Sequence, residues 1–262
     1  MRMWVAVVAL CLPALVVLTG CDQMQSAMVQ VGIADPELPP PNTVDVICDA
    51  SVGSTCTRET LYTSLGSVLQ YAGRRPGSTV RLWVLGMDFA NSALVGEQVS
   101  TRPARKGPKI YKAHIERWTE SVREYFLKAA EPFISHPGNT RSPIAEGISK
   151  VAIYGSPGGV PRVILLISDA REVSGFGDFE CGTLPTADTF TGKAHQAGVL
   201  APGSLTNARF LFAYVTEGEV QGHRCAFTVA RAAKIRRLWE EALRRAGATQ
   251  ISIGSGPPAL SE

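Results

Sequence analysis

The sequence lacks the features that mark nucleic-acid-binding proteins, histidine-based metal or catalytic sites, zinc sites and phosphate loops. Its charge is nearly balanced, at +3, so composition gives no global argument for binding nucleic acid. The four histidines are scattered along the chain, which argues against a histidine metal cluster or a catalytic triad. No CxxC pattern is present, which argues against a zinc site. The phosphate-loop pattern GxxxxGKS or GxxxxGKT is also absent.

The chain has one long apolar run, from Trp4 to Leu18, which follows a short segment containing Arg2. It is too short and too weakly flanked to indicate a transmembrane helix. The run ends in Leu18-Thr19-Gly20-Cys21, which resembles the lipobox of bacterial lipoproteins. The resemblance implies a signal peptide over residues 1–20 and a lipid on Cys21. The alternative is an ordinary signal peptide with a cysteine there by chance.

This resemblance also predicts where the protein is located. We expect a lipid-anchored protein on the extracytoplasmic, periplasmic face of a bacterial membrane. Asp22 follows the lipidated cysteine, and in sorting of the enterobacterial type an aspartate there favours the inner membrane. Residues 21–43 contain several prolines and no sustained periodicity, so we expect a tether between the lipid and the domain.

Residues 44–262 are long enough for one α/β domain. Apolar runs that fit buried strands alternate with amphipathic helical segments, which predicts a doubly wound, mostly parallel sheet flanked by helices. The predicted strands are 44–48, 79–85, 91–98, 162–168, 209–215 and 248–253, and the predicted helices are one ending near 73 and those over 110–133, 143–153 and 225–246. Residues 171–207 are rich in Gly, Thr and Pro and show no clear helix or strand pattern. A structureless loop of that length is uncommon and often functional.

Two predicted strands are each followed directly by an aspartate. Asp49 follows Val44–Cys48, and Asp169 follows the apolar run that ends at Ser168. The carboxyl ends of parallel strands form the ligand-binding edge of such a sheet. Carboxylates with neighbouring hydroxyls suit a hard cation. The alternative is that each aspartate merely caps a following helix.

In the order of these motifs, the chain resembles the von Willebrand factor A family, which has a Rossmann-like fold. Asp49-Ala50-Ser51 resembles the start of its Asp-x-Ser-x-Ser motif, but Gly53 stands at the second serine position and Ser54 follows. Ser142 stands at the place of the family's threonine, with Thr140 as a nearby substitute. Ser142 is also predicted to be the N-cap of the helix that follows.

The resemblance implies a metal-ion-dependent adhesion site. Its ligands here would be Asp49, Ser51, Ser54, Ser142 and Asp169, holding Mg²⁺ or another divalent cation. The third motif, ending in Ser168-Asp169-Ala170, has alanine where the family usually has glycine. The alternative is a domain that has kept the fold and lost the metal.

The function implied is a membrane-anchored, non-enzymatic module that binds a protein partner in the cell envelope. In the family, an acidic side chain of the partner completes the metal's coordination. One alternative is a metal-free structural subunit that makes contact through residues 171–207 and the basic run around Lys106. The other is a metal-assisted phosphoester hydrolase using Asp49, disfavoured because Ser51 stands where the haloacid-dehalogenase pattern has a second aspartate.

Four cysteines remain outside the signal peptide and the lipidation site: Cys48, Cys56, Cys181 and Cys225. An exported compartment permits disulfides, and four cysteines allow three pairings. We favour a disulfide between Cys181 and Cys225, both expected in connections at the carboxyl edge of the sheet. Cys48 and Cys56 either pair with each other or remain buried thiols.

Overall fold

Two parallel strands form the centre of the sheet, β1 (Thr43–Cys48) and β4 (Arg162–Ile167). Every residue of both strands is buried. Their nearly continuous apolar sequences are typical of strands covered on both faces. They pair in register, with Cys48 opposite Ile167. The computed structural model describes residues 38–86, 88–104, 107–137, 140–156, 159–215, 225, 228–258 and 260.

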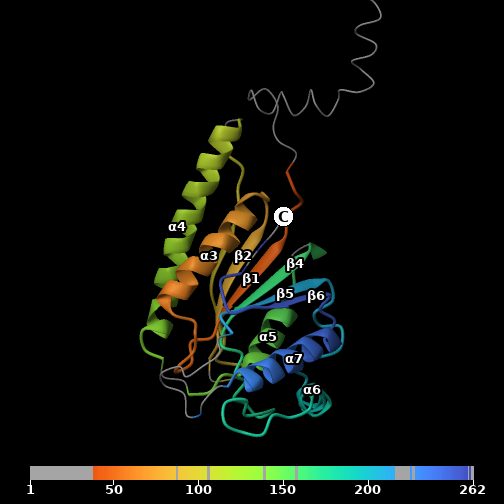
Figure 1. Cartoon of the computed structure of the whole chain (residues 1–262). Coiled ribbons are helices and arrows are strands. Elements are labelled where there is room, and N and C mark those ends of the chain that lie inside the picture. The colour runs from red at the N-terminus through yellow and green to blue at the C-terminus, as the bar shows by residue number, and fades with distance from the viewer. Residues whose placement is uncertain are drawn as a thin grey trace, which may run out of the picture.

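The described residues form six strands in the spatial order β3-β2-β1-β4-β5-β6 (Figure 1). All neighbours are parallel except β2 and β3, which are antiparallel, so β3 is an antiparallel edge strand. The other elements, in chain order, are α3 (Arg58–Gly73), β2 (Thr79–Val84), β3 (Ala93–Val99), α4 (Pro108–Ile134), α5 (Ile144–Tyr154), α6 (Ala187–Gln196), β5 (Ala208–Ala213), α7 (Val229–Arg245) and β6 (Gln250–Ile253). This is a Rossmann-like, doubly wound α/β fold, which confirms the predicted fold class.

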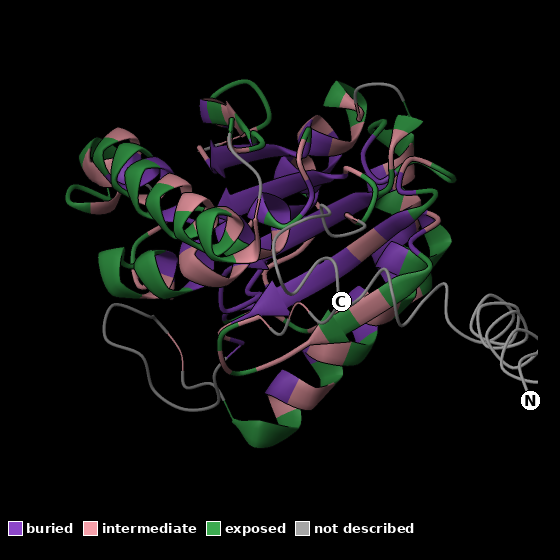
Figure 2. Ribbon diagram, turned by 90° about the horizontal axis from the view of Figure 1, so that it is seen from above, coloured by how far each residue is buried: buried purple, intermediate pink, exposed green. Residues whose placement is uncertain are grey.

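The helices form two layers with the sheet between them. Alternate residues of each central strand point to opposite faces, and each set is buried in its own hydrophobic core. On one face α3 and α4 pack against Val46 and Leu165. On the other face α5, α6 and α7 pack against Ile47 and Leu166. Figure 2 shows the buried strands between helices whose outer surfaces are exposed.

Some helix boundaries and faces differ from the predictions. The segment 171–207 is not a continuous loop, because it contains α6, whose sequence ADTFTGKAHQ offers few apolar residues to mark it. Helix α7 begins at Val229 rather than at Cys225, because the Thr228 hydroxyl caps it by accepting a hydrogen bond from the backbone N–H of Arg231. The apolar spacing within 225–246 predicts Ala233 on the inward face of this helix, but Ala232 is buried instead.

The predicted inward face of α4 is partly wrong. The apolar spacing within 110–133 predicts Val122, Tyr125 and Phe126 on one inward side. Val122 and Phe126 are buried, but Tyr125 is 46% exposed. Leu127 and Ala130 are buried instead. Helix α4 packs against α3, β2 and β3. A long helix in contact with several elements buries a broader stripe than one apolar row predicts.

Candidate functional site

The strand order reverses between β1 and β4, and this point carries both strand-end aspartates. The chain leaves β1 towards α3 on one face, whereas the helices connected to β4 lie on the other face. Ligands of open α/β sheets bind outside the carboxyl ends of the strands at such a switch point. Asp49 follows β1 and its backbone N–H donates to the carbonyl of Ile167 in β4. The fold therefore places Asp49 and Asp169 at the same edge.

Asp49 is the centre of a buried hydrogen-bond cluster. Its side chain is 1% exposed, and its Oδ2 accepts hydrogen bonds from the hydroxyls of Ser142 at 2.6 Å and Ser168 at 2.8 Å. Its Oδ1 accepts from the backbone N–H of Ser51 at 3.2 Å. Burial raises the pKa of Asp49, and the nearby charge of Asp169 raises it further, while the bonds from the three serines lower it. Two of the predicted ligands, Asp49 and the Ser142 hydroxyl, thus meet here, whereas Ser51 contacts Asp49 through its backbone N–H.

Asp169 lies next to a buried arginine. Its Oδ1 accepts the backbone N–H of Arg171 at 3.0 Å, and its Oδ2 lies 3.4 Å from Arg171 Nε. Both side chains are buried. Burial lowers the pKa of Arg171, and the charges of Asp169 and Glu180 oppose that shift. The site therefore carries a cation of its own.

The connection after β4 bends sharply at Ala170, whose φ is 65°. This left-handed conformation is one that glycine adopts more readily than alanine. The Trp239 Nε1–H donates to the Ala170 carbonyl at 3.0 Å, so this buried side chain of α7 holds the bend in place.

A third buried carboxylate, Glu172, was not among the predicted site residues. It is fully buried, and its Oε2 accepts the backbone N–H of Ala145 in the first turn of α5 at 2.9 Å. Burial raises the pKa of Glu172 to about 8, with smaller contributions from the charges of Glu146 and Asp49. The sequence signal for Glu172 is its position, three residues after Asp169, close to the carboxyl end of β4.

Ser142 does not cap α5, so that prediction is wrong. The N-cap position is Pro143, without a side-chain hydrogen bond, and the Ser142 hydroxyl is used by Asp49. Ser142 and Val173 exchange both backbone hydrogen bonds, which fixes the segment before α5 against the loop after β4. Thr140, the nearby substitute, is exposed.

The alternative that Asp49 and Asp169 are helix caps is also wrong. Helix α3 is capped by Thr57, which forms a capping box with Thr60. The next helix after Asp169 is α6, which is capped by Thr186. Both aspartates therefore serve the cluster at the strand ends rather than a helix terminus.

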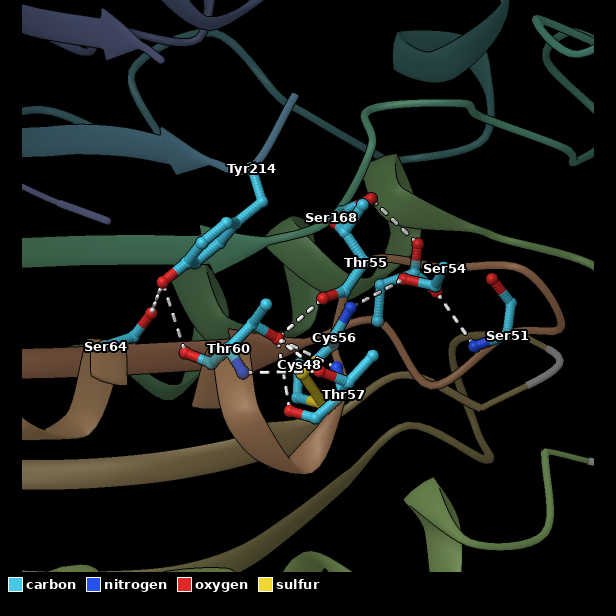
Figure 3. Close-up of a disulfide and its surroundings, with 11 residues drawn as sticks. Cys48, Ser51, Ser54, Thr55, Cys56, Thr57, Thr60, Ser64, Ser168 and Tyr214 are labelled. Carbon is cyan, nitrogen blue, oxygen red and sulfur yellow. Dashed lines mark hydrogen bonds between the residues drawn. A yellow bond between two sulfur atoms is a disulfide. The ribbon is translucent and has the colours of Figure 1, made fainter. Parts of the chain in front are cut away.

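A disulfide between Cys48 and Cys56 closes the loop that carries Ser51 and Ser54 (Figure 3). Gly53 has φ 78°, a left-handed conformation that a serine would rarely adopt, which accounts for glycine at the second serine position. The Ser54 hydroxyl accepts the backbone N–H of Cys56 at 3.3 Å. The loop is thus fixed at both ends, with Ser54 turned to its own backbone.

The second disulfide joins Cys181 to Cys225, the pairing that the sequence favoured. It ties the loop after β4 to the segment before α7. Two disulfides fit an extracytoplasmic protein, because such bonds persist in oxidising compartments. In the part of the chain that is described, no helix is both long and apolar enough to cross a membrane. Cys21 and Lys106 lie outside the described residues.

The donor set at the edge fits a hard cation. Carboxylates and hydroxyls are the oxygen ligands preferred by Mg²⁺ and Ca²⁺. Within the described ranges, no three His, Cys, Asp or Glu side chains form a group that could hold a metal. A cation would therefore depend on serine hydroxyls and water in addition to Asp49 and Asp169.

Comparisons with known proteins give distant structural similarity. No family model and no curated protein matches the sequence. An aerotolerance-related membrane protein from Bacteroides fragilis is 14% identical, with 81% of this chain and 90% of that chain covered and a TM-score of 0.40. The conserved hypothetical protein BatB from Bacteroides thetaiotaomicron is 11% identical, with 84% and 92% covered and a TM-score of 0.43. The pilus adhesin SpaC from Lactobacillus rhamnosus GG is 12% identical, with 85% and 29% covered and a TM-score of 0.46.

Proposed function

We propose that this chain is an extracytoplasmic protein-binding module of the von Willebrand factor A type, anchored to a bacterial membrane by a lipid on Cys21. Residues Asp49, Ser51, Ser142 and Asp169 would hold a divalent cation, most simply Mg²⁺, at the carboxyl edge of the sheet, and Ser54 would join them by releasing its hydrogen bond with the Cys56 N–H. The observation that carries the proposal is the bond between Ser142 and Asp49. It brings two of the ordered motifs together at the switch point, although 93 residues separate them in sequence.

The residues around the proposed ligands would keep the edge ordered. Ser142 and Ser168 orient one oxygen of Asp49, and the Cys48–Cys56 disulfide restrains the loop that carries Ser51. When bound, the cation would offer a coordination position to a carboxylate of the partner. The partner's charge would then be recognised by the cation, and its shape by the loops around it.

One of these loops presents an aromatic side chain. Phe89 is 38% exposed in the loop after β2. Its backbone N–H donates to Glu146 of α5, and Lys150 of α5 donates to its carbonyl at 2.9 Å. A loop fixed in this way presents its side chain with little ordering cost on binding. Phe89 is thus suited to contact a partner at the same edge of the sheet, because β2 runs parallel to β1.

Calorimetry of the full chain in detergent, titrated with Mg²⁺, tests the metal. We expect one binding event that Asp49→Asn abolishes, since the amide keeps the shape of the side chain and removes its charge. Glu124→Gln, on the exposed surface of α4, is the matched control and should bind normally. Equal binding by wild type and Asp49→Asn, or no heat at all, would reject the metal role.

A metal-free structural subunit is the second candidate, and Arg171 favours it. Its guanidinium already lies beside Asp169, and two hydroxyls already bond to Asp49. These contacts stabilise both carboxylates without an added ion. Cross-linking in membranes separates the two functions. Partners lost in Asp49→Asn favour the cation-dependent module, and partners retained favour the structural subunit.

A further inference from the structure

A second concave surface lies between α7 and the segment that leads into α6. This α7 groove has a volume of about 690 Å³. Leu184, Pro185 and Leu238 give it an apolar floor, and Arg231, Lys234 and Arg237 are its basic residues. A volume of this size is typical of ligand-binding pockets.

The basic residues of the groove have different roles. The Arg231 guanidinium is used structurally, because it donates to the carbonyls of Phe179 at 2.8 Å and Gly182 at 2.7 Å. Lys234 and Arg237 are exposed and have no ion pair or hydrogen bond with any described residue. The Arg231 bonds, with the nearby Cys181–Cys225 disulfide, keep the wall of the groove ordered. The other two cations are therefore available to a ligand.

The charge of the groove favours an anionic ligand. Among the described residues that line it, Glu241 is the acidic one, and it is paired with Arg245 at 2.5 Å. Lys234 and Arg237 stand about one turn apart on the same helix. The apolar floor between the helix and Pro185 suits a side chain such as leucine. A flat membrane surface would not reach a concave floor, whereas an extended peptide would.

We propose that the α7 groove binds a short acidic peptide segment of a partner protein, with carboxylates at Lys234 and Arg237 and an apolar side chain on Leu184 and Leu238. This site needs no metal, and none of the described residues that line it is a proposed cation ligand. Its success or failure is therefore independent of the function proposed above.

The test is fluorescence anisotropy with the full chain in detergent and a labelled peptide of sequence Glu-Leu-Glu-Glu-Leu-Glu. We expect saturable binding that weakens with added salt and survives EDTA and the Asp49→Asn substitution. The double variant Lys234→Gln/Arg237→Gln should bind about tenfold more weakly. Arg244→Gln, an exposed arginine of α7 outside the groove, is the matched control and should bind as wild type does.

A variant of opposite sign separates a charge effect from a folding effect. Glu241→Gln removes the acidic lining residue and should tighten peptide binding by a factor of about two to three. A peptide with Gln in place of Glu that binds equally well would overturn the proposal. Equal weakening by Arg244→Gln would also overturn it. So would binding to phosphatidylglycerol vesicles, dependent on Lys234 and Arg237, in the absence of peptide binding.

Discussion

The hydroxyl of Ser142 donates a hydrogen bond of 2.6 Å to Asp49, although 93 residues separate them in the chain. Neither residue belongs to a helix or a strand. Asp49 is positioned by the end of β1, and Ser142 by its two backbone bonds to Val173. The bond therefore forms only when three segments meet at one edge of the sheet: the loop after β1, the segment before α5 and the loop after β4.

Ser142→Ala should destabilise the fold by about 1–3 kcal/mol, because it removes a bond to a buried carboxylate. The pKa of Asp49 should rise further, since a bond that lowers it is lost. Urea unfolding at neutral pH measures the stability change. Ser121→Ala, at an exposed position of α4, is the control and should have almost no effect. Equal urea unfolding midpoints for the two variants would contradict a stabilising role for the bond between Ser142 and Asp49.

The fold was predictable because its central strands are marked by composition. Val163 to Ile167 is apolar on both faces, and Val44 to Cys48 is apolar except for Asp45, a pattern that few structures other than a covered parallel strand allow. Asp49 and Asp169 could be placed at one edge because parallel strands end together. Helix α6 could not be predicted, because Thr189, Thr191 and Gly192 give its sequence low helix propensity.

The partners of the site residues depend on tertiary contacts that local patterns do not encode. Ser142 before Pro143 has the local pattern of a helix cap, yet its hydroxyl bonds to Asp49, which follows β1. The role of Glu172 depends on its burial, and a carboxylate in a polar loop is usually exposed. Local sequence therefore identified the carboxylates at the strand ends but not the buried acid beside them.

Glu172 should make stability depend on pH. Its pKa rises from 4.5 to about 8 on folding, so between these values the folded state binds more protons than the unfolded state. The contribution of Glu172 to stability is therefore greatest at low pH and falls as pH rises through this window, with a slope of at most about 1.4 kcal/mol per pH unit. Asp49, whose pKa is also raised, acts in the same direction.

Urea unfolding in EDTA between about pH 5 and pH 8 measures this dependence. Glu172→Gln should flatten the profile, because the amide cannot ionise. Its stability relative to wild type should improve as pH rises. Glu124→Gln should leave the slope of wild type unchanged, since Glu124 is exposed on α4. A Glu172→Gln profile parallel to that of wild type would show that this carboxyl does not titrate abnormally.

The two disulfides should differ in their contribution to stability. Cys48–Cys56 spans 8 residues, whereas Cys181–Cys225 spans 44. Chain entropy predicts losses of about 2–3 and about 4 kcal/mol when each pair is replaced by serine. Only the first replacement should also weaken Mg²⁺ binding, because it frees the loop that carries Ser51. Urea unfolding and Mg²⁺ calorimetry of both double variants test this. If loss of the Cys181–Cys225 disulfide weakened Mg²⁺ binding more than loss of the Cys48–Cys56 disulfide, the cation would not lie at the loop that carries Ser51.

Cys21→Ser should release the protein from the membrane if the lipobox is processed. Metabolic labelling with palmitate should mark wild type and not this variant. Cys11→Ser, inside the expected signal peptide, is the matched control and should still be labelled. Labelling that persists in Cys21→Ser would rule out this cysteine as the attachment site.

Arg171→Gln should raise the affinity for Mg²⁺. The Arg171 guanidinium lies 3.4 Å from Asp169 Oδ2, where its charge competes with any cation held by that carboxylate. At an effective dielectric constant of about 20, two charges several ångströms apart interact by a few kcal/mol, so a tenfold gain, about 1.4 kcal/mol, is a conservative expectation. Arg171→Lys keeps the charge and should bind Mg²⁺ as weakly as wild type. Calorimetry of the three proteins would contradict the proposed site if Arg171→Gln bound no better than Arg171→Lys, because a cation held by Asp169 would respond to the loss of that charge.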